Sequence, residues 1–408
     1  MFLQSLPMVF ILSGLALYIV LGGADLGAGF WQLAAARRWN AREVREFAHH
    51  AMAPVWETNH VWLIFVLTVF WTSYATAFGS IMSTLAIPLF IALLGIIARG
   101  AAYALREGTR TPRESERIDT IFALSSILVP FALGTAVGAI ATNRVPVGNA
   151  AGHMWSSWLN GTSIVVGVLA VATSAHLAAV YLAADAAHDH EQTLERGFRL
   201  RALGSGLLAG ALAIGAIFVM NTDNHRLYHS LLSGRALPAV IVSAACGLST
   251  LLLVYRRRYE WARYATSLAV AAIVAGWALS RWPTILPHLS VYQAAAEHDT
   301  LVCVVVAVLG GAVVLLPSLA LLFRLTLAGR FRSDEVTAPV TAATTPHPAN
   351  RRLIGRVAIA CLIAGFGLLN IADADWAHAV GVVCLFDFVG LAFYAIVVPA
   401  LDQYAANP

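Results

Sequence analysis

The sequence predicts an all-α fold, a polytopic transmembrane helical bundle of about nine spans plus two extra C-terminal spans. Of its 408 residues, 59% are apolar and only 12% are charged, whereas a soluble domain carries about 25% charged residues. Apolar stretches recur along the chain at about twenty residues each, the length of helix that crosses a bilayer. A membrane β-barrel would instead show alternating segments of about ten residues, and the sequence has no such pattern.

The apolar stretches divide the chain into a body and an appendage. The nine predicted spans of the body are 8–32, 54–78, 80–105, 119–142, 159–184, 203–221, 237–255, 263–281 and 301–323, and two further spans follow at 353–371 and 377–400. Between them, residues 333–352 are rich in Pro, Thr and Ala without apolar periodicity, which is typical of a flexible linker. We therefore predict a nine-helix body at 1–332, a cytoplasmic linker at 333–352 and a two-helix appendage at 353–408.

The arginines predict the orientation of the chain. The net charge is +4 and no lysine is present. Connections that follow the odd-numbered spans hold twenty-one arginines, whereas the other connections hold four, namely Arg144, Arg226, Arg235 and Arg281. Because basic residues concentrate on the cytoplasmic side of membrane proteins, this alternation predicts a multi-pass protein with its N-terminus outside. It also argues against a nucleic-acid surface, which would need the basic residues on one face.

Away from the span ends, the clear cases of charged residues inside predicted spans are Asp25, Glu57, Arg99 and Asp387. A charge in the bilayer costs a few kcal/mol or more, so such residues are candidates for function. The predicted orientation places Asp25, Glu57 and Arg99 in the cytoplasmic third of the membrane, and His60 shares a helix face with Glu57. These groups can form a proton path from the cytoplasm, or Arg99 can neutralise Asp25 or Glu57 and tie the first helices together. Asp387 needs a partner, and another subunit can supply it.

Other motifs are assigned to packing. The glycines in residues 22–29 predict close helix contact, with a helix break near a cofactor or water as the alternative. Glu57 and His60 form the only intramembrane Glu-x-x-His, whereas di-iron bundles use two copies. A lone histidine such as His176 is more typical of packing than of haem ligation, and the four cysteines occur singly. We therefore predict no metal site in this chain.

Several segments together resemble subunit II of cytochrome bd-type quinol oxidases. The clearest is residues 54–63 (PVWETNHVWL), which is similar to the P-x-W-D-x-N-x-V-W-L motif of that family. Residues 23–29 (GADLGAG) resemble its G-F-D-x-G-x-G motif, and residues 99–103 (RGAAY) stand where the family has an arginine-led motif. Residues 130–138 and Trp282-Pro283 also fit. The resemblance covers about 1–332, and this chain departs from it at Ala24 and Glu57, where the family usually has phenylalanine and aspartate.

The resemblance implies the haem-free subunit of a quinol:oxygen oxidoreductase in a bacterial plasma (inner) membrane. In that family, subunit I holds haem b and haem d (or only b-type haems) and the quinol-oxidising loop, and subunit II is its scaffold and contributes to a proton path. Some members also hold a bound quinone in subunit II. By motif match, Asp25 and Glu57 belong to the proton path, and Trp56, Asn59, His60 and Arg99 support them.

Two alternatives stay open. A proton-coupled secondary transporter also uses intramembrane acids and arginines, although the sequence lacks an inverted repeat. A purely structural assembly subunit would use the acids only to pair with arginines. The two C-terminal spans are outside the family pattern, and we hypothesise that they fill the groove that small accessory subunits fill in related oxidases.

Overall fold

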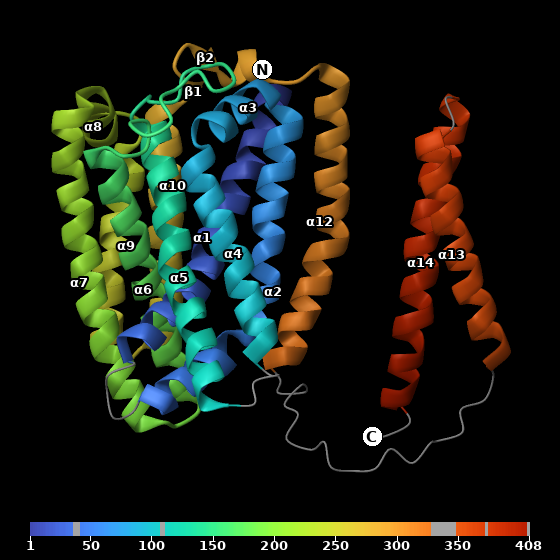
Figure 1. Ribbon diagram of the computed structural model, residues 1–408, viewed down its shortest axis with the longest axis horizontal. Helices are drawn as coiled ribbons and strands as arrows, with labels where there is room; N and C mark the ends of the chain where they lie inside the picture. Colours follow the sequence, from blue (N-terminus) through green and yellow to red (C-terminus); the bar gives the residue numbers. More distant parts are fainter. Residues whose placement is uncertain (36–40, 107–110, 328–347, 372–373, 406–408) are drawn as a thin grey trace. The chain divides into compact units, whose positions relative to one another are not determined.

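The structure is a computed structural model that describes residues 1–35, 41–106, 111–327, 348–371 and 374–405. The chain forms two compact units, Met1–Ala320 and Leu321–Pro408. Apart from one small hairpin, the regular structure in the described residues is helical (Figure 1). Eight of these helices are long and apolar enough to cross a membrane, and three further helical segments are apolar but shorter. The prediction of an all-α transmembrane bundle is confirmed.

The helices of the first unit are α1 (Phe2–Ala35), α2 (Ala41–Ser73), α3 (Ala75–Thr84), α4 (Ala86–Arg106), α5 (Pro112–Ala141), α6 (Gly161–His188), α7 (Gln192–Asp223), α8 (His225–Ser233), α9 (Leu237–Tyr255), α10 (Tyr259–Arg281), α11 (Val291–Ala294) and α12 (His298–Leu327). The last of these extends past the boundary of the unit. Strands β1 (Thr284–Leu286) and β2 (Leu289–Ser290) form an antiparallel hairpin between α10 and α11.

The element order of the first unit repeats. Helices α1 to α5 and helices α6 to α10 each run as two long helices, one short helix and two long helices. Within each set the first helix packs on the second and the last, and the two sets meet through α1, α5, α6 and α10. Helices α1 and α6 both begin at the same end of the bundle (Figure 1). The two sets are therefore parallel copies of one arrangement, which the sequence does not reveal as a periodic repeat.

The two ends of this bundle differ in composition. The N-terminus, α3, α8 and the β1–β2 hairpin lie at one end, and the C-terminal ends of α1, α4, α6 and α9 lie at the other (Figure 1). Arg106 and residues 256–258 belong to the latter, which we call the arginine-rich end. The long helices thus alternate in direction as the arginine pattern requires. Which end faces the cytoplasm stays a prediction.

The largest difference from the predicted spans lies between α2 and α4. The predicted spans 54–78 and 80–105 divide this region near residue 79, whereas the structure has breaks at Tyr74 and Leu85, with the short helix α3 between them. The Tyr74 side chain is fully buried, and its hydroxyl donates a 2.6 Å hydrogen bond to the Gln4 carbonyl oxygen. A hydropathy profile does not register this break because apolar residues continue through both positions.

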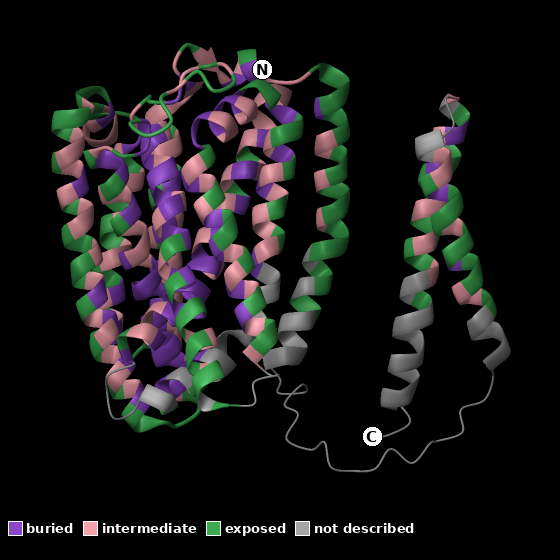
Figure 2. Ribbon diagram, viewed as in Figure 1, coloured by how far each residue is buried: buried purple, intermediate pink, exposed green. Residues whose placement is uncertain are grey.

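Buried residues follow the contact between the two helix sets. They concentrate along α1, α5 and α6, whereas α7, α9 and α12 are mostly half-buried or exposed (Figure 2). One core cluster joins α1, the start of α2 and α6 to α7 and α10, and a second joins α1, α2 and α3 to the β1–β2 hairpin. The exposed side chains of α7, α9 and α12 are largely Leu, Ile, Val and Phe, which suits contact with lipid or with another membrane subunit.

The second unit is a helical hairpin of α13 (Pro348–Ile371) and α14 (Asp375–Ala405). The two helices approach closely at Gly365, where an added Cβ would lie 2.9 Å from the Gly381 carbonyl oxygen. Most of the predicted linker, 333–352, falls on residues 328–347, which are outside the described part of the chain. The division at 1–332, 333–352 and 353–408 stays a prediction.

Candidate functional site

Asp25 and Arg99 form an ion pair inside the bundle. Asp25 lies two-thirds of the way along α1 and is 4% exposed, and Arg99 lies near the end of α4 and is 1% exposed. One Arg99 nitrogen, Nη2, donates to the Asp25 carboxylate and also to the Asp25 backbone carbonyl oxygen, at 3.0 Å for the latter. Both residues lie toward the arginine-rich end. The structure therefore pairs Arg99 with Asp25, one of the two acids that the sequence offered.

Helix α5 completes the surroundings of Arg99. Its second terminal nitrogen, Nη1, donates to the Ser126 hydroxyl, and that hydroxyl donates to the Phe122 carbonyl oxygen at 2.6 Å. The Phe122 ring lies under the guanidinium, 4.0 Å from its centroid to Cζ, a geometry in which the ring attracts the cation. One arginine thus joins α1, α4 and α5. The sequence reasoning missed Ser126 and Phe122 because neither residue type signals an arginine partner by itself.

Helix α2 contributes the remaining polar groups near Asp25. Asn59 is buried, and its amide donates to the Leu21 carbonyl oxygen at 3.3 Å. Asn59 and His60 both lie close enough to Asp25 to act on its charge. The backbones of Trp56 and Glu57 lie in α2, but their side chains are outside the described part of the structure. Of the other five predicted site residues, three thus lie around the Asp25 carboxylate, namely Arg99, Asn59 and His60.

The glycines beside Asp25 serve close packing. A Cβ added at Gly27 would overlap the Ser174 carbonyl group of α6, and one added at Gly29 would overlap the Ser126 side chain of α5. Nearby, the Trp31 indole donates a 2.7 Å hydrogen bond to the Ala175 carbonyl oxygen. Helix α1 is continuous through this region. The close-packing interpretation is confirmed, and the alternative of a helix break is wrong.

A second ion pair at the arginine-rich end was not predicted. Arg263 of α10 donates through Nη2 to the Asp185 carboxylate and, at 3.0 Å, to the Tyr181 carbonyl oxygen, both on α6. The Tyr181 hydroxyl lies 3.1 Å from the Ser267 hydroxyl. The predicted span 159–184 ends just before Asp185, so this acid was treated as part of a loop. The structure instead places it in the last turn of α6.

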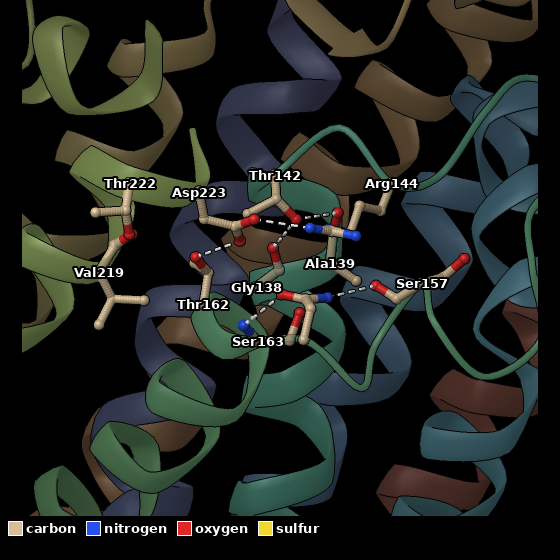
Figure 3. Close-up of polar contacts among 11 residues, drawn as sticks. Gly138, Ala139, Thr142, Arg144, Ser157, Thr162, Ser163, Val219, Thr222 and Asp223 are labelled. Atoms are coloured by element: carbon tan, nitrogen blue, oxygen red, sulfur yellow. Dashed lines mark hydrogen bonds and ion pairs between the residues drawn. The ribbon is translucent and has the colours of Figure 1, made fainter. Parts of the chain in front are cut away.

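The opposite end is held by a polar cluster around Asp223 (Figure 3). Arg144 donates to Asp223 Oδ1 and the Thr162 hydroxyl donates to Asp223 Oδ2, both at 2.7 Å. Asn160 caps α6 by accepting from the Ser163 amide at 3.0 Å. These contacts tie the loop after α5, the start of α6 and the end of α7 together. Arg144, predicted only as a loop arginine, therefore joins helices.

His176 does not offer a haem pocket. Its Nδ1 lies 3.0 Å from the Ala202 carbonyl oxygen, and the backbone of α7 packs on the ring, since a Cβ at Gly206 would lie 2.7 Å from Cε1. Among the histidines whose burial the structure describes, it is the one that is buried. The part of the chain that is described also contains no group of three His, Cys, Asp or Glu side chains placed to hold a metal. These contacts agree with the interpretation of His176 as a hydrogen-bonded packing residue, and the assignment of the haems to another subunit stays a prediction.

The fold and these buried groups define an integral membrane protein of many spans, with ionisable side chains held between its helices. The model of the family described as cytochrome bd terminal oxidase subunit II matches residues 3–326. The chain belongs to this family. It is accordingly a subunit of a respiratory oxidoreductase complex whose other main component is subunit I, and oxidases of this family depend on haem.

Two known proteins are similar to the chain. Cytochrome bd ubiquinol oxidase subunit 2 of Bacillus subtilis (strain 168) is 21% identical over 273 residues, which is 66% of this chain and 77% of that protein. A solved structure of bd oxidase from Geobacillus thermodenitrificans superposes with a TM-score of 0.64 at 26% identity, covering 80% of this chain and 99% of the matched one. The family match ends at residue 326, before α13 begins at Pro348.

Proposed function

We propose that this chain is the haem-free subunit of a quinol:oxygen oxidoreductase, in which it scaffolds the haem-bearing subunit I and contributes to a proton path. In the proposed reaction, quinol is oxidised, oxygen is reduced to water, and the protons consumed come from the cytoplasm. The observation that carries the proposal is the buried polar group around Asp25, which draws on four helices near the arginine-rich end. Burying charged side chains within the membrane costs free energy, and a role in proton transfer would explain why this chain has them there.

The contacts suggest different roles for the two acids. The Asp25 carboxylate already has the Arg99 guanidinium as counter-charge, so we assign it a positioning role toward Asn59 and His60 on α2. Glu57, three residues before His60 on the same helix, is the proposed proton carrier. Trp56 is proposed to shape the wall of the path. In this arrangement a proton moves between Glu57, His60 and ordered water, while the Asp25–Arg99 pair keeps its two charges.

The orientation of the proposal follows from the arginines. The connections at the arginine-rich end would face the cytoplasm of a bacterium, and the N-terminus would lie outside the plasma membrane. Asp25 and Arg99 lie toward the same end as these connections. The distance from the cytoplasm to these two residues would therefore be short, and protons are drawn from that side. Lipid is proposed to surround the exposed apolar faces of α7 and α9.

The haems are assigned to subunit I. When bound, haem b and haem d (or b-type haem alone) supply electron transfer and the reduction of oxygen. The packing of His176 against α7 supports this assignment, since His176 is the buried histidine among those whose burial is described. The role of the chain is then to hold the partner and to move protons. A bound quinone in this subunit stays a prediction.

A secondary transporter and a purely structural subunit are the two alternative functions. A secondary transporter built on an inverted repeat would have its two halves in opposite directions, whereas α1 and α6 of the described helices run in the same direction (Figure 1). A purely structural subunit has one specific observation in its favour, because Arg99 neutralises Asp25 and ties three helices together. Substitution of Glu57 by glutamine distinguishes this candidate from a subunit with a proton path.

Isolation of the complex tests the proposal directly. We expect purification through a tag on this chain to bring along a larger membrane subunit, with b- or d-type haem bands in reduced-minus-oxidised spectra and quinol-dependent oxygen uptake. Bands that persist when the partner is expressed alone would place the haems there. A chain that emerges alone and colourless from gentle detergent would contradict the proposal, and proton-coupled transport assays would then be appropriate.

The second unit is proposed to replace a small accessory subunit in cis. Asp387 of α14 is exposed, and the preceding residue, Phe386, is 73% exposed. Within the described part of the chain it forms no ion pair or hydrogen bond. A carboxylate inside a span needs a donor, and subunit I is the proposed source.

Deletion of 333–408 is expected to weaken the complex. The truncated chain should still insert, since the family match ends at residue 326, but it should retain less subunit I and haem after detergent extraction. Asp387→Leu should reproduce part of that loss, while Asp402→Leu, at the C-terminal end of α14, serves as the matched control. An unchanged haem-to-protein ratio in the truncated complex would sink the idea.

A further inference from the structure

Two histidines lie side by side on the short helix α8. His225 and His229 are four residues apart, and both are exposed. Side chains at this spacing share one helix face. Their ring centroids are 4.5 Å apart and the ring planes stand at 87°. Rings this close are within reach of one ion, which each would bind through a nitrogen at about 2.0–2.1 Å.

A hydrogen bond prepares one of the rings for metal binding. His225 Nδ1 lies 2.8 Å from the Asn221 side-chain oxygen, which can only accept. This geometry suits the tautomer with its proton on Nδ1, in which the Nε2 lone pair is available to a ligand. Metal-binding histidines commonly donate the other ring N–H to such an oxygen, because the contact fixes both the tautomer and the ring orientation. This feature points to a ligand at Nε2, in addition to the spacing.

The backbone of α8 is held in place from several sides. Asn224 caps the helix by accepting from the Leu227 amide at 3.1 Å, and the Leu227 side chain is buried. The Ser230 hydroxyl donates to the Ser280 carbonyl oxygen of α10 at 2.6 Å. Because the backbone of α8 is fixed, only side-chain rotation is needed for the two rings to converge on one ion. Binding therefore costs little conformational entropy.

We propose that His225 and His229 form a binding site for a divalent transition-metal ion of the kind that imidazole prefers, Zn²⁺ or Cu²⁺. The two Nε2 atoms are the protein ligands, and water completes the coordination, since the described residues near α8 offer no third His, Cys, Asp or Glu ligand. Imidazole suits these ions, and Cu²⁺ binds such sites more tightly than Zn²⁺. The proposed proton path does not involve these residues.

The site would act as a clamp on the end of the bundle opposite the arginine-rich end. Helix α8 joins α7 to α9, and it begins two residues after Asp223, whose contacts close the ends of α5, α6 and α7 (Figure 3). An ion that bridges two turns of α8 binds the folded state alone, so it raises stability in proportion to the logarithm of its concentration above Kd. The predicted orientation makes the site accessible to metal outside the cell.

Copper binding to the intact complex tests this site. The complex is purified through a tag without histidine, and Cu²⁺ is titrated while electron paramagnetic resonance records ions with nitrogen ligands. We expect one such ion per wild-type complex, and none at the same concentration in the His225→Gln/His229→Gln variant. Asn221→Ala should raise the half-saturating Cu²⁺ concentration by about tenfold, the usual effect of removing a ligand's supporting hydrogen bond.

His298→Gln is the matched control. His298 is also exposed, and its Nδ1 lies 3.2 Å from Asp299 at the start of α12, so its removal should leave the titration unchanged. Thermal unfolding with and without Zn²⁺ gives a second readout, in which the wild-type complex gains stability and the double variant does not. Equal half-saturation in the wild type and the double variant would overturn the proposal, as would a loss of the signal in His298→Gln.

Discussion

Replacing Arg99 by methionine is expected to destabilise the subunit and to reduce the yield of assembled complex severely. The substitution leaves the Asp25 carboxylate buried without its counter-charge, and it removes the contacts to Ser126 and to the Phe122 ring. Breaking a buried ion pair by removing one partner costs about 3–5 kcal/mol, a large part of the stability of a typical domain. The measurement is the amount of complex recovered after extraction, together with its unfolding temperature.

A double variant distinguishes the effect of leaving Asp25 without its counter-charge from the effect of losing the volume of the Arg99 side chain. In Asp25→Asn/Arg99→Met neither charge remains, so much of the stability should return, because an apolar or neutral replacement of a buried pair is often nearly neutral. Arg106→Met is the matched control on the same helix. Arg106 contacts Asp119 at 3.3 Å in a half-buried position, where a pair contributes about 1 kcal/mol or less. A double variant as unstable as Arg99→Met would contradict the importance of this pair.

Glu57→Gln is expected to slow oxygen reduction while leaving the complex assembled. Glutamine keeps the shape of the side chain and removes the group that would carry the proton. Loss of a proton-transferring group typically costs about 10²-fold or more in rate, so quinol-dependent oxygen uptake should fall by about that factor at unchanged haem content. Glu57→Asp keeps a carboxylate, the residue type usual in the family motif, and should retain most of the activity.

Glu43→Gln controls for the removal of a negative charge from α2. Glu43 is exposed in the first turn of the same helix, and its replacement should leave oxygen uptake unchanged. If Glu57→Gln instead prevents assembly, the acid is structural and the proposal of a subunit that only scaffolds is favoured. Full activity in an assembled Glu57→Gln complex would remove Glu57 from the proton path.

The long helices could be predicted from the sequence because each is an apolar run of the right length. Their ends could not. Helix α7 begins at Gln192 rather than near residue 203, since its first ten residues carry charges that a membrane does not cover. The short elements α3, α8, α11 and the hairpin were missed for a related reason. They depend on single contacts, such as the Asn224 cap, that hydropathy does not register.

The site was predictable in kind and only partly in its connections. An aspartate and an arginine in apolar spans must be paired because of their cost in lipid, and the arginine pattern placed Asp25 and Arg99 at a similar depth. The sequence left Asp25 and Glu57 as equal partners for Arg99, since the choice depends on helix rotation. Ser126, Asp185 and Arg263 escaped notice because a serine in a span is common and the other two lie at helix ends.

The glycine contact between α1 and α6 also limits where water can run. At Gly27 the two helices touch backbone to backbone, with no space for even one Cβ, and a file of water molecules needs room and polar partners at every step. The seam between the two helix sets is therefore dry beside Asp25. A chain of water molecules that reaches the Asp25 carboxylate therefore has to come from the side of α1 where α2 places Asn59 and His60. A drug or substitution that fills the space on that side would block the water chain without contacting the ion pair.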